Sequence, residues 1–315
     1  MKNLITVPKT FASPDDGVAL VKSWEQAFDK RLDEVAEQIS HACVYEGVKI
    51  IRLSGPSCAG KTTTADKLEA ALEAAGRSVY PISLDDFYHG KAYLHRRAEQ
   101  HLGGKLDYDS VDTLDLDTLH ACVHDLMTKG KAEMPVFDFK LGDRKGYYTL
   151  DTTKDEKPPV FLFEGIQAVY PQVVDMMSEA SQRSVFISVL SSLAVGDAVF
   201  EPNEIRLMRR LVRDEAKRNA TPAFTLMLWH SVRANEETSI FPHADACDIH
   251  IDSAMGFDVH MLAPHLRRLL QKHSLPKDAE DAAVVKSLLQ KLKGVEGISH
   301  DCLAPNSLYH EFILA

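Results

Sequence analysis

The sequence predicts an α/β fold: a doubly wound, mostly parallel β-sheet flanked by helices, with a basic helical lid. First, short β-branched apolar runs alternate with segments in which apolar residues recur every three or four positions, as strands and helices do. Second, the first such run, residues 48–53, leads directly into a glycine-containing loop and then a helix. Third, two later runs each end in an acidic residue, and ligands bind at the carboxyl ends of strands in open α/β sheets.

The chain before the first strand divides into two parts. Residues 1 to about 17 contain proline and aspartate and are expected to form a loose arm. From Val18 to about Tyr45 the spacing of apolar residues is helical, which predicts a helix packed on the core. We therefore expect an N-terminal arm and helix over 1–47, a core over 48–275 with a lid at about 200–240, and a helical tail over 276–315.

Residues 55–62 read G-P-S-C-A-G-K-T and match G-x-x-x-x-G-K-[ST], the P-loop pattern. A predicted helix over Thr63–Ala75 follows, and Gly76 stands where a helix stops. Such a loop turns backbone N–H groups toward phosphate oxygens, while Lys61 reaches the β- and γ-phosphates and the Thr62 hydroxyl holds Mg²⁺. The pattern predicts ATP and Mg²⁺ as cofactors, bound by Gly55, Pro56, Ser57, Cys58, Ala59, Gly60, Lys61, Thr62 and Thr63.

Two acids at strand ends are candidates for the chemistry. Glu164 ends the apolar run 159–163, where P-loop proteins place the carboxylate that helps to hold Mg²⁺. Asp85 follows the predicted strand 78–84 and is a candidate general base for an acceptor hydroxyl. Asp86 competes for that role, and spacing alone does not choose between the two aspartates.

The region between these acids is less regular. Residues 89–117 form a long excursion, basic first and then rich in aspartate, with a helix predicted over 114–127. A short strand is expected at 135–139 and a hairpin-like segment over 141–153. Further strands are expected at 184–190 and 247–252, a closing helix at 260–271, and a helix with an extended end over 279–315.

A strongly basic helix is predicted over 205–218, in a chain with a net charge of −10. We interpret it as a lid that neutralises phosphate charge during transfer, because guanidinium groups bind phosphate in a bidentate manner. The alternative, a solvated helix face, stays open. Spacings of three and four place several of the basic residues on one face; they are Arg206, Arg209, Arg210, Arg213, Lys217 and Arg218, with Arg213 expected at the nucleotide.

Composition narrows the class of protein. The 315 residues are 45% hydrophobic and 26% charged, and the net negative charge argues against a general nucleic-acid binder. The five cysteines are scattered without a C-x-x-C pair, so neither a disulfide framework nor a zinc site is expected, and a cytoplasmic location fits. The sequence shows no signal peptide and no apolar run near 18 residues. We expect a small-molecule hydroxyl acceptor as partner, no nucleic acid and no membrane, with a homo-oligomer left open.

Six motifs appear in the order in which they occur in one family, so the chain resembles the uridine kinase/phosphoribulokinase family of P-loop kinases. The match covers about residues 48–270. The motifs are 55–63 (GPSCAGKTT), 83–88 (SLDDFY), 106–109 with 114–115 (LDYD…LD), 135–139 with Arg144 (PVFDF…R), 163–166 (FEGI) and 206–214 (RLMRRLVRD). Residues 229–242 and 305–313 are similar to a longer bacterial branch whose members are often labelled nucleoside kinases.

The resemblance implies a role for individual residues. Asp85 matches the family's general base, and Asp107 matches the carboxylate that holds the ribose hydroxyls. Thr62 and Glu164 match the Mg²⁺ ligands, and Arg206 and Arg209 match lid arginines that meet phosphates or acceptor. The implied catalytic residues are Asp85, Lys61 and Arg209; the implied acceptor-binding residues are Asp85, Tyr88, Asp107, Phe137 and Arg206.

The sequence departs from the family at the acceptor base. Uridine kinases read the pyrimidine with a tyrosine and a histidine, and here these positions hold Phe137 and Gly142. We expect phosphoryl transfer from ATP to a hydroxyl, with a nucleoside as the first candidate acceptor. A sugar, a sugar phosphate or a pantothenate-like alcohol is the alternative acceptor. A regulatory ATP-binding protein is the alternative of another class, and the intact Lys61, Thr62, Asp85 and Glu164 count against it.

Overall fold

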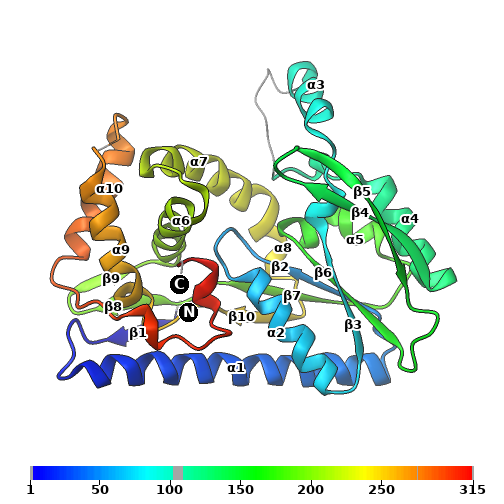
Figure 1. The fold of residues 1–315 in the computed structure, drawn as a ribbon, viewed down its shortest axis with the longest axis horizontal. Helices are drawn as coiled ribbons and strands as arrows, with labels where there is room; N and C mark the ends of the chain where they lie inside the picture. Colours follow the sequence, from blue (N-terminus) through cyan, green and yellow to red (C-terminus); the bar gives the residue numbers. More distant parts are fainter. Residues whose placement is uncertain (1–2, 102–108, 275, 314–315) are drawn as a thin grey trace.

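The computed structural model describes residues 3–101, 109–274 and 276–313, and its centre is a five-stranded parallel sheet. The strand order is β10-β7-β2-β6-β3 (Figure 1). This confirms the predicted α/β fold with a parallel sheet flanked by helices. The strands are β2 (Ile50–Ser54), β3 (Ser78–Ser83), β6 (Pro159–Glu164), β7 (Gln182–Ser188) and β10 (Ile249–Asp252).

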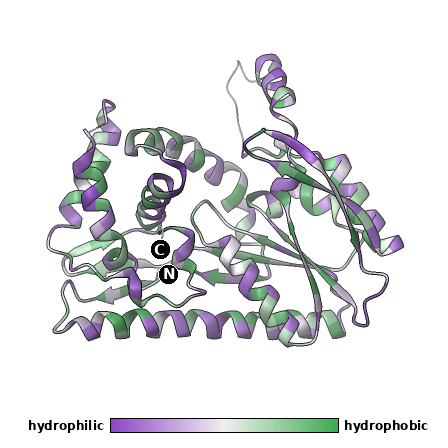
Figure 2. Cartoon of the chain, viewed as in Figure 1, coloured by the Kyte–Doolittle hydropathy of each residue, from purple (hydrophilic) through white to green (hydrophobic). Residues whose placement is uncertain are grey.

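Helices cover the sheet through two hydrophobic clusters, and successive residues of one strand alternate between them. Ile51 and Leu53 of β2 join the larger cluster, whereas Ile50 joins the smaller one. Figure 2 shows hydrophobic residues concentrated in these central strands, as a sheet covered on both faces requires. The larger cluster includes α1 (Pro14–Tyr45), α2 (Lys61–Ala74), α6 (Pro202–Arg218) and α9 (Asp258–Lys272); the smaller includes α4 (Leu116–Lys129), α5 (Pro171–Met176) and α8 (Phe241–Ala244).

The N-terminal residues are more ordered than the sequence predicted. Instead of a loose arm, strand β1 (Leu4–Val7) pairs in parallel with β8 (Ser192–Val195), and β9 (Ala198–Phe200) completes a second, three-stranded sheet. The partner strand lies almost two hundred residues away in the sequence, so local composition carried no sign of the pairing. Helix α1 then runs along the length of the molecule in Figure 1.

Part of the chain between β3 and β6 projects from the sheet in Figure 1. It contains an antiparallel hairpin of β4 (Lys131–Asp138), which is longer than the predicted strand 135–139, and β5 (Asp143–Asp151), which lies within the predicted hairpin-like segment 141–153. It also contains α3 (Lys91–His101), where the sequence predicted irregular backbone. Helix α3 buries Leu94 and Ala98 but is otherwise mostly polar, which explains the weak periodic signal.

The basic helix predicted over 205–218 is α6, and it packs into the core through apolar residues such as Ile205, Met208 and Leu211. Helix α7 (Pro222–Asn235) follows and continues into a π-helical turn, Glu236–Ile240. After α10 (Ala279–Lys291) the chain returns to the sheet, and a short 3₁₀ turn, Leu308–Glu311, lies against α2. Within the described residues, no helix is both long and apolar enough to cross a membrane.

Candidate active site

Three neighbouring strands bring the predicted site residues to one edge of the sheet. Strand β6 lies between β2 and β3, and Glu164 is the register partner of both Leu53 and Ser83. The P-loop follows β2 and Asp85 follows β3, so both flank Glu164 at the carboxyl ends of their strands. A cavity of about 1050 Å³ opens here, lined by Lys61, Thr62, Asp85 and Glu164 together with residues of α6, α7 and the C-terminal segment, Ser307–Ile313.

Glycine is required at two positions of the P-loop. A Cβ at Gly55 would stand 2.1 Å from the carbonyl oxygen of Ile187 on β7. Gly60 is the N-cap of α2 with a φ of +91°, and a Cβ there would stand 2.3 Å from the Leu308 side chain. The loop therefore packs against β7 at Gly55 and against the C-terminal segment at Gly60. Lys61 and Thr62 face the cavity.

Asp85 is the aspartate that faces the cavity. Burial raises the pKa of its carboxyl, and Lys61 partly offsets that increase. Its carboxyl is hydrogen-bonded to the Tyr88 hydroxyl, which accepts a 3.1 Å hydrogen bond from the Gln167 amide. Asp86 instead accepts a 2.9 Å hydrogen bond from the Phe137 backbone N–H and does not line the cavity. The structure thus separates the two aspartates, which spacing alone left open.

Glu164 and Thr62 both line the cavity, and both carry oxygen atoms of the kind that hard divalent cations bind. Burial raises the pKa of Glu164 to about 7, with an opposing contribution from Lys61. The part of the chain that the structure describes holds no group of three histidine, cysteine or acidic residues placed to bind a metal. Mg²⁺ usually takes one or two protein oxygens and completes its shell with water and phosphate oxygens, so a site for it needs no such group.

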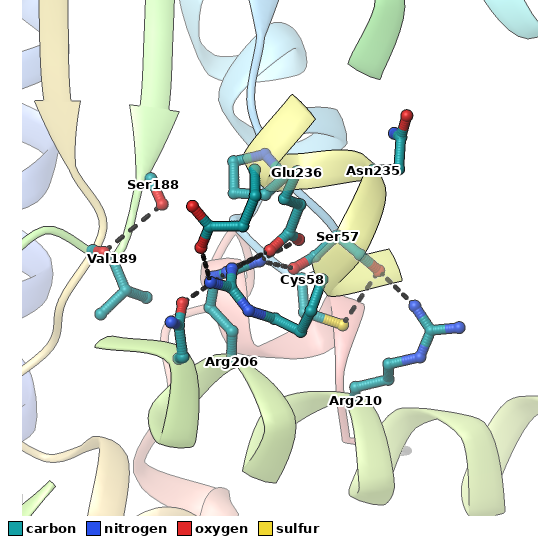
Figure 3. A network of polar contacts seen from close by, with 12 residues as sticks. Ser57, Cys58, Ser188, Val189, Arg206, Arg210, Asn235 and Glu236 are labelled. Carbon is teal, nitrogen blue, oxygen red and sulfur yellow. Dashed lines mark hydrogen bonds and ion pairs between the residues drawn. The ribbon is translucent and has the colours of Figure 1, made fainter. Parts of the chain in front are cut away.

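Arg206 is fully buried, and its guanidinium is held by polar groups around it (Figure 3). Both terminal nitrogens contact the Glu236 carboxylate, at 2.5 and 2.7 Å. They also donate to Asn203 at 2.8 Å and to the backbone carbonyl of Ser57 in the P-loop at 3.2 Å. Four of its five N–H donors are therefore engaged, and Arg206 does not line the cavity.

Arg209 is also fully buried, and all five of its N–H donors are used. Two go to the Asp258 carboxylate at 2.7 and 2.8 Å, and two go to the backbone oxygen and hydroxyl of Ser253. The fifth reaches the backbone carbonyl of Cys58 in the P-loop at 3.4 Å. In this arrangement Arg209 has no donor left for a phosphate oxygen.

Arg210 and Arg213, on the same helix, line the cavity. Arg210 donates to the Ser57 hydroxyl at 2.9 Å, and Arg213 binds Asp214 through two nitrogens at 3.0 and 2.8 Å. Among the described residues, Nη2 of Arg210 and Nη1 of Arg213 have no hydrogen-bond partner. These two side chains keep donors free for an anion, whereas Arg206 and Arg209 do not.

Tyr88 and Phe137, two of the residues expected at the acceptor, lie next to each other. Tyr88 lines the cavity, and the Phe137 ring meets its edge with centroids 5.8 Å apart. Gly142 has a φ of +68° and its carbonyl accepts a 2.7 Å hydrogen bond from the Lys91 N–H, so it shapes the turn between β4 and β5. Asp107 lies outside the described residues.

The sequence interpretation missed three contributors to the cavity region. The buried Gln167 donates a hydrogen bond to the Tyr88 hydroxyl. A single glutamine after a strand forms no sequence motif, so nothing in the sequence indicated this contact. Arg210 was recognised only as one of several basic residues. Glu311 lines the cavity with Lys61 and Arg213 nearby, which oppose the burial that raises its pKa. It lies 250 positions after the P-loop lysine, so only the fold reveals the proximity.

A model of the phosphoribulokinase/uridine kinase family matches residues 50–260. The chain belongs to this family. The matched region includes the P-loop, Asp85, Glu164 and the arginines of α6, which are the groups that the geometry collects around one cavity.

Several curated relatives carry uridine kinase names. A uridine kinase of Ureaplasma urealyticum is 27% identical over 58% of this chain and 76% of its own length. Uridine-cytidine kinase A of Dictyostelium discoideum is 26% identical over 71% of this chain and 40% of its own length. Among solved structures, a possible uridine kinase from Bacillus stearothermophilus matches with a TM-score of 0.45 and 18% identity, covering 71% of this chain and 98% of that one.

Membership makes the chain a P-loop kinase, which transfers a phosphoryl group from ATP to a hydroxyl of a small molecule. The expected enzyme class and family are therefore confirmed. The identity of the acceptor is a finer question, since the relatives are only about a quarter identical to this chain.

Proposed function

We propose that the protein phosphorylates a primary hydroxyl of a nucleoside, with Mg²⁺ accompanying ATP. The observation that carries the proposal is the position of Asp85, which faces the same cavity as Lys61 and Thr62 and is hydrogen-bonded to Tyr88. A carboxylate there can take the proton of an acceptor hydroxyl as that hydroxyl attacks the γ-phosphate. The nucleoside names of the curated relatives support the choice of acceptor class.

Each residue then has a task in an otherwise electrostatic mechanism. Lys61 and the P-loop N–H groups hold the phosphates, and Thr62 and Glu164 hold Mg²⁺. Arg213 and Arg210 bring free guanidinium donors to the negative charge of the transferring group. We propose that Arg206 and Arg209 keep the P-loop in place through its carbonyl oxygens. Asp107, by resemblance, binds the ribose hydroxyls.

A second acceptor class is supported by one specific feature. At the positions that read the pyrimidine in uridine kinases, Phe137 lacks a hydroxyl and Gly142 lacks a side chain. Without those hydrogen bonds the site loses much of its power to discriminate between bases. A sugar, a sugar phosphate or another small alcohol is the second candidate acceptor. The intact catalytic set counts against a purely regulatory ATP-binding role.

An acceptor-dependent ADP-release assay with Mg-ATP tests the proposal. A panel of nucleosides and sugar alcohols is run with the wild type, Asp85→Asn and Asp86→Asn. We expect turnover on a nucleoside, with kcat reduced about 10²- to 10⁴-fold in Asp85→Asn because the general base is lost. Asp86→Asn is the matched control, since an amide oxygen still accepts from the Phe137 N–H.

Two outcomes would contradict parts of the proposal. Turnover only on a non-nucleoside alcohol would reject the nucleoside and retain the kinase chemistry. A reduction of less than tenfold in Asp85→Asn, with a larger one in Asp86→Asn, would move the general base to Asp86.

A further inference from the structure

The C-terminal segment, defined here as Ser307–Ile313, lies beside the P-loop in space although it is the last described part of the chain. It is largely buried: Leu308 is 2% exposed, and Tyr309 and Phe312 are fully buried. Three sets of contacts link it to the P-loop and the cavity.

The first contact is steric. The Leu308 side chain fills the space beside Gly60 so closely that a Cβ on Gly60 would stand 2.3 Å from it. Gly60 is the N-cap of α2 and the last residue before Lys61. Leu308 therefore packs on the hinge between the P-loop and the helix that carries Lys61 and Thr62.

The second contact is a chain of buried polar groups that ends on the loop. The Tyr309 hydroxyl donates to the Asp258 carboxylate, and Asp258 also binds Arg209 with both oxygens. Arg209 in turn donates to the Cys58 carbonyl. The rings of Tyr309 and Phe312 lie 5.7 and 5.1 Å from the Arg209 guanidinium. The segment therefore contacts this arginine through cation–π interactions, while Asp258 pairs with it by charge.

The backbone conformation at Cys58, whose carbonyl Arg209 contacts, depends on the contacts around it. Cys58 has a φ of +60°, a left-handed conformation that a side chain disfavours, so surrounding contacts must maintain it. The buried Arg209 guanidinium donates a hydrogen bond to the Cys58 carbonyl and so contacts this peptide. Loss of its orientation would allow the loop to relax away from the shape that receives phosphates.

The third contact places a carboxyl group in the cavity itself. Glu311 lines the cavity, and its Oε2 is buried without a hydrogen-bond partner among the described residues. Lys61 and Arg213 are the nearby cations that act on it most strongly. The segment thus reaches the same two cations that the phosphates are proposed to meet.

We propose that the C-terminal segment is a working part of the ATP site, in which Tyr309, acting through Asp258 and Arg209, and Leu308, acting on Gly60, position the P-loop for the phosphates. The inference rests on the donor half of the proposed function and not on the identity of the acceptor. Its test therefore uses MgADP alone, so its failure and the failure of a nucleoside acceptor are distinguishable.

The test compares full-length Tyr309→Phe with the wild type. Isothermal titration measures the Kd for MgADP, and amide hydrogen exchange follows the peptide that spans Gly55 to Lys61. Phenylalanine keeps the ring beside Arg209 and removes only the hydroxyl. We expect MgADP binding to weaken about fivefold, the size of one lost hydrogen bond, and the P-loop amides to exchange faster.

A matched control separates positioning from general stability. Leu288→Ala removes a buried side chain from α10, in the same core cluster but away from the P-loop. It should lower the thermal midpoint and leave both the MgADP Kd and P-loop exchange unchanged. Leu308→Ala is the second variant of the segment and should speed P-loop exchange as Tyr309→Phe does.

The proposal is overturned if both Tyr309→Phe and Leu308→Ala bind MgADP within twofold of the wild type and show wild-type P-loop exchange. It is equally overturned if Leu288→Ala weakens MgADP as much as they do, because the segment would then act only through stability.

Discussion

The two sides of the cavity are built on different principles. The phosphate side consists of the P-loop, α6 and the C-terminal segment, where Arg206 and Arg209 are fully buried and paired with carboxylates. On the side proposed for the acceptor, Tyr88 lines the cavity and the β4–β5 hairpin packs behind it, where Phe139 and Leu141 are 66% and 68% exposed. A rigid, pre-organised side suits the constant chemistry of ATP, and an open side suits an acceptor that varies between relatives.

The phosphate side contains a second contrast within one helix. Arg206 and Arg209 point into the protein and support the P-loop from behind, whereas Arg210 and Arg213 line the cavity. All four residues are arginines on one helix, so residue type does not distinguish them. The number of hydrogen-bond donors already in use does, and it underlies the supporting and ligand-binding roles proposed for them.

The largest expected effects, on stability and on ATP binding, come from replacing a buried arginine, Arg209, or a cavity-lining arginine, Arg213, with alanine. Arg209→Ala leaves Asp258 buried without its partner, so we expect a loss of about 3–5 kcal/mol in the free energy of unfolding. Arg213→Ala leaves Asp214 with Arg210 and Arg218, so stability should change by less than about 1 kcal/mol while the KM for ATP rises about tenfold. Urea unfolding and steady-state kinetics measure the two effects.

The opposite pattern would remove the distinction. If Arg209→Ala unfolded at the wild-type urea concentration with a raised KM for ATP, Arg209 would be a phosphate ligand in the working enzyme. The buried arrangement would then be only one of its conformations.

Much of the phosphate side could be predicted because its parts are local in sequence. The P-loop, its preceding strand and its helix are contiguous, and their backbone geometry requires glycine at Gly55 and Gly60. Glu164 follows from the rule that ligands bind at the carboxyl ends of parallel strands. These inferences need only the strand–loop–helix pattern and no knowledge of distant contacts.

The remainder depends on contacts between segments far apart in the chain. Helical spacing located the basic helix but did not show which arginines face inward, because that depends on Glu236 and Asp258. Sequence spacing does not distinguish Asp85 from Asp86, whereas the hydrogen bond from the distant Phe137 N–H to the Asp86 carboxylate does. The C-terminal segment and strand β1 pair with partners that no local periodicity indicates.

Glu164 lies on the strand between the two sides and gives a pH-dependent test with an intermediate effect. Burial raises its pKa from 4.5 to about 7, so the folded, ligand-free protein holds a proton that the unfolded chain releases. Stability from this group is complete below about pH 4.5 and is lost as pH rises through about 7, at about 1.4 kcal/mol per unit of pKa difference.

Thermal midpoints between pH 5.5 and 8 without Mg²⁺ should therefore fall more steeply in the wild type than in Glu164→Gln. Asp85 has its pKa raised by burial in the same direction, so the variant should keep part of the slope. MgADP should reduce the wild-type loss, since the cation takes the place of the proton. Equal slopes in the two proteins would show that Glu164 is already ionised at pH 5.5 and lies in a wetter site than its burial indicates.

The smallest expected effect tests the acceptor side. Phe137→Tyr restores the hydroxyl that uridine kinases carry at this position, beside Tyr88 and on the strand that Asp86 anchors. One neutral hydrogen bond is worth about 1 kcal/mol, so kcat/KM for uridine relative to a purine nucleoside should rise about fivefold. The KM for ATP should stay unchanged, because the ring contacts described for Phe137 are with Tyr88 and Phe139 and not with the P-loop or α6. A change in the KM for ATP without a change in base preference would mean that the two sides are coupled, and that Phe137 supports the loop rather than reading the acceptor.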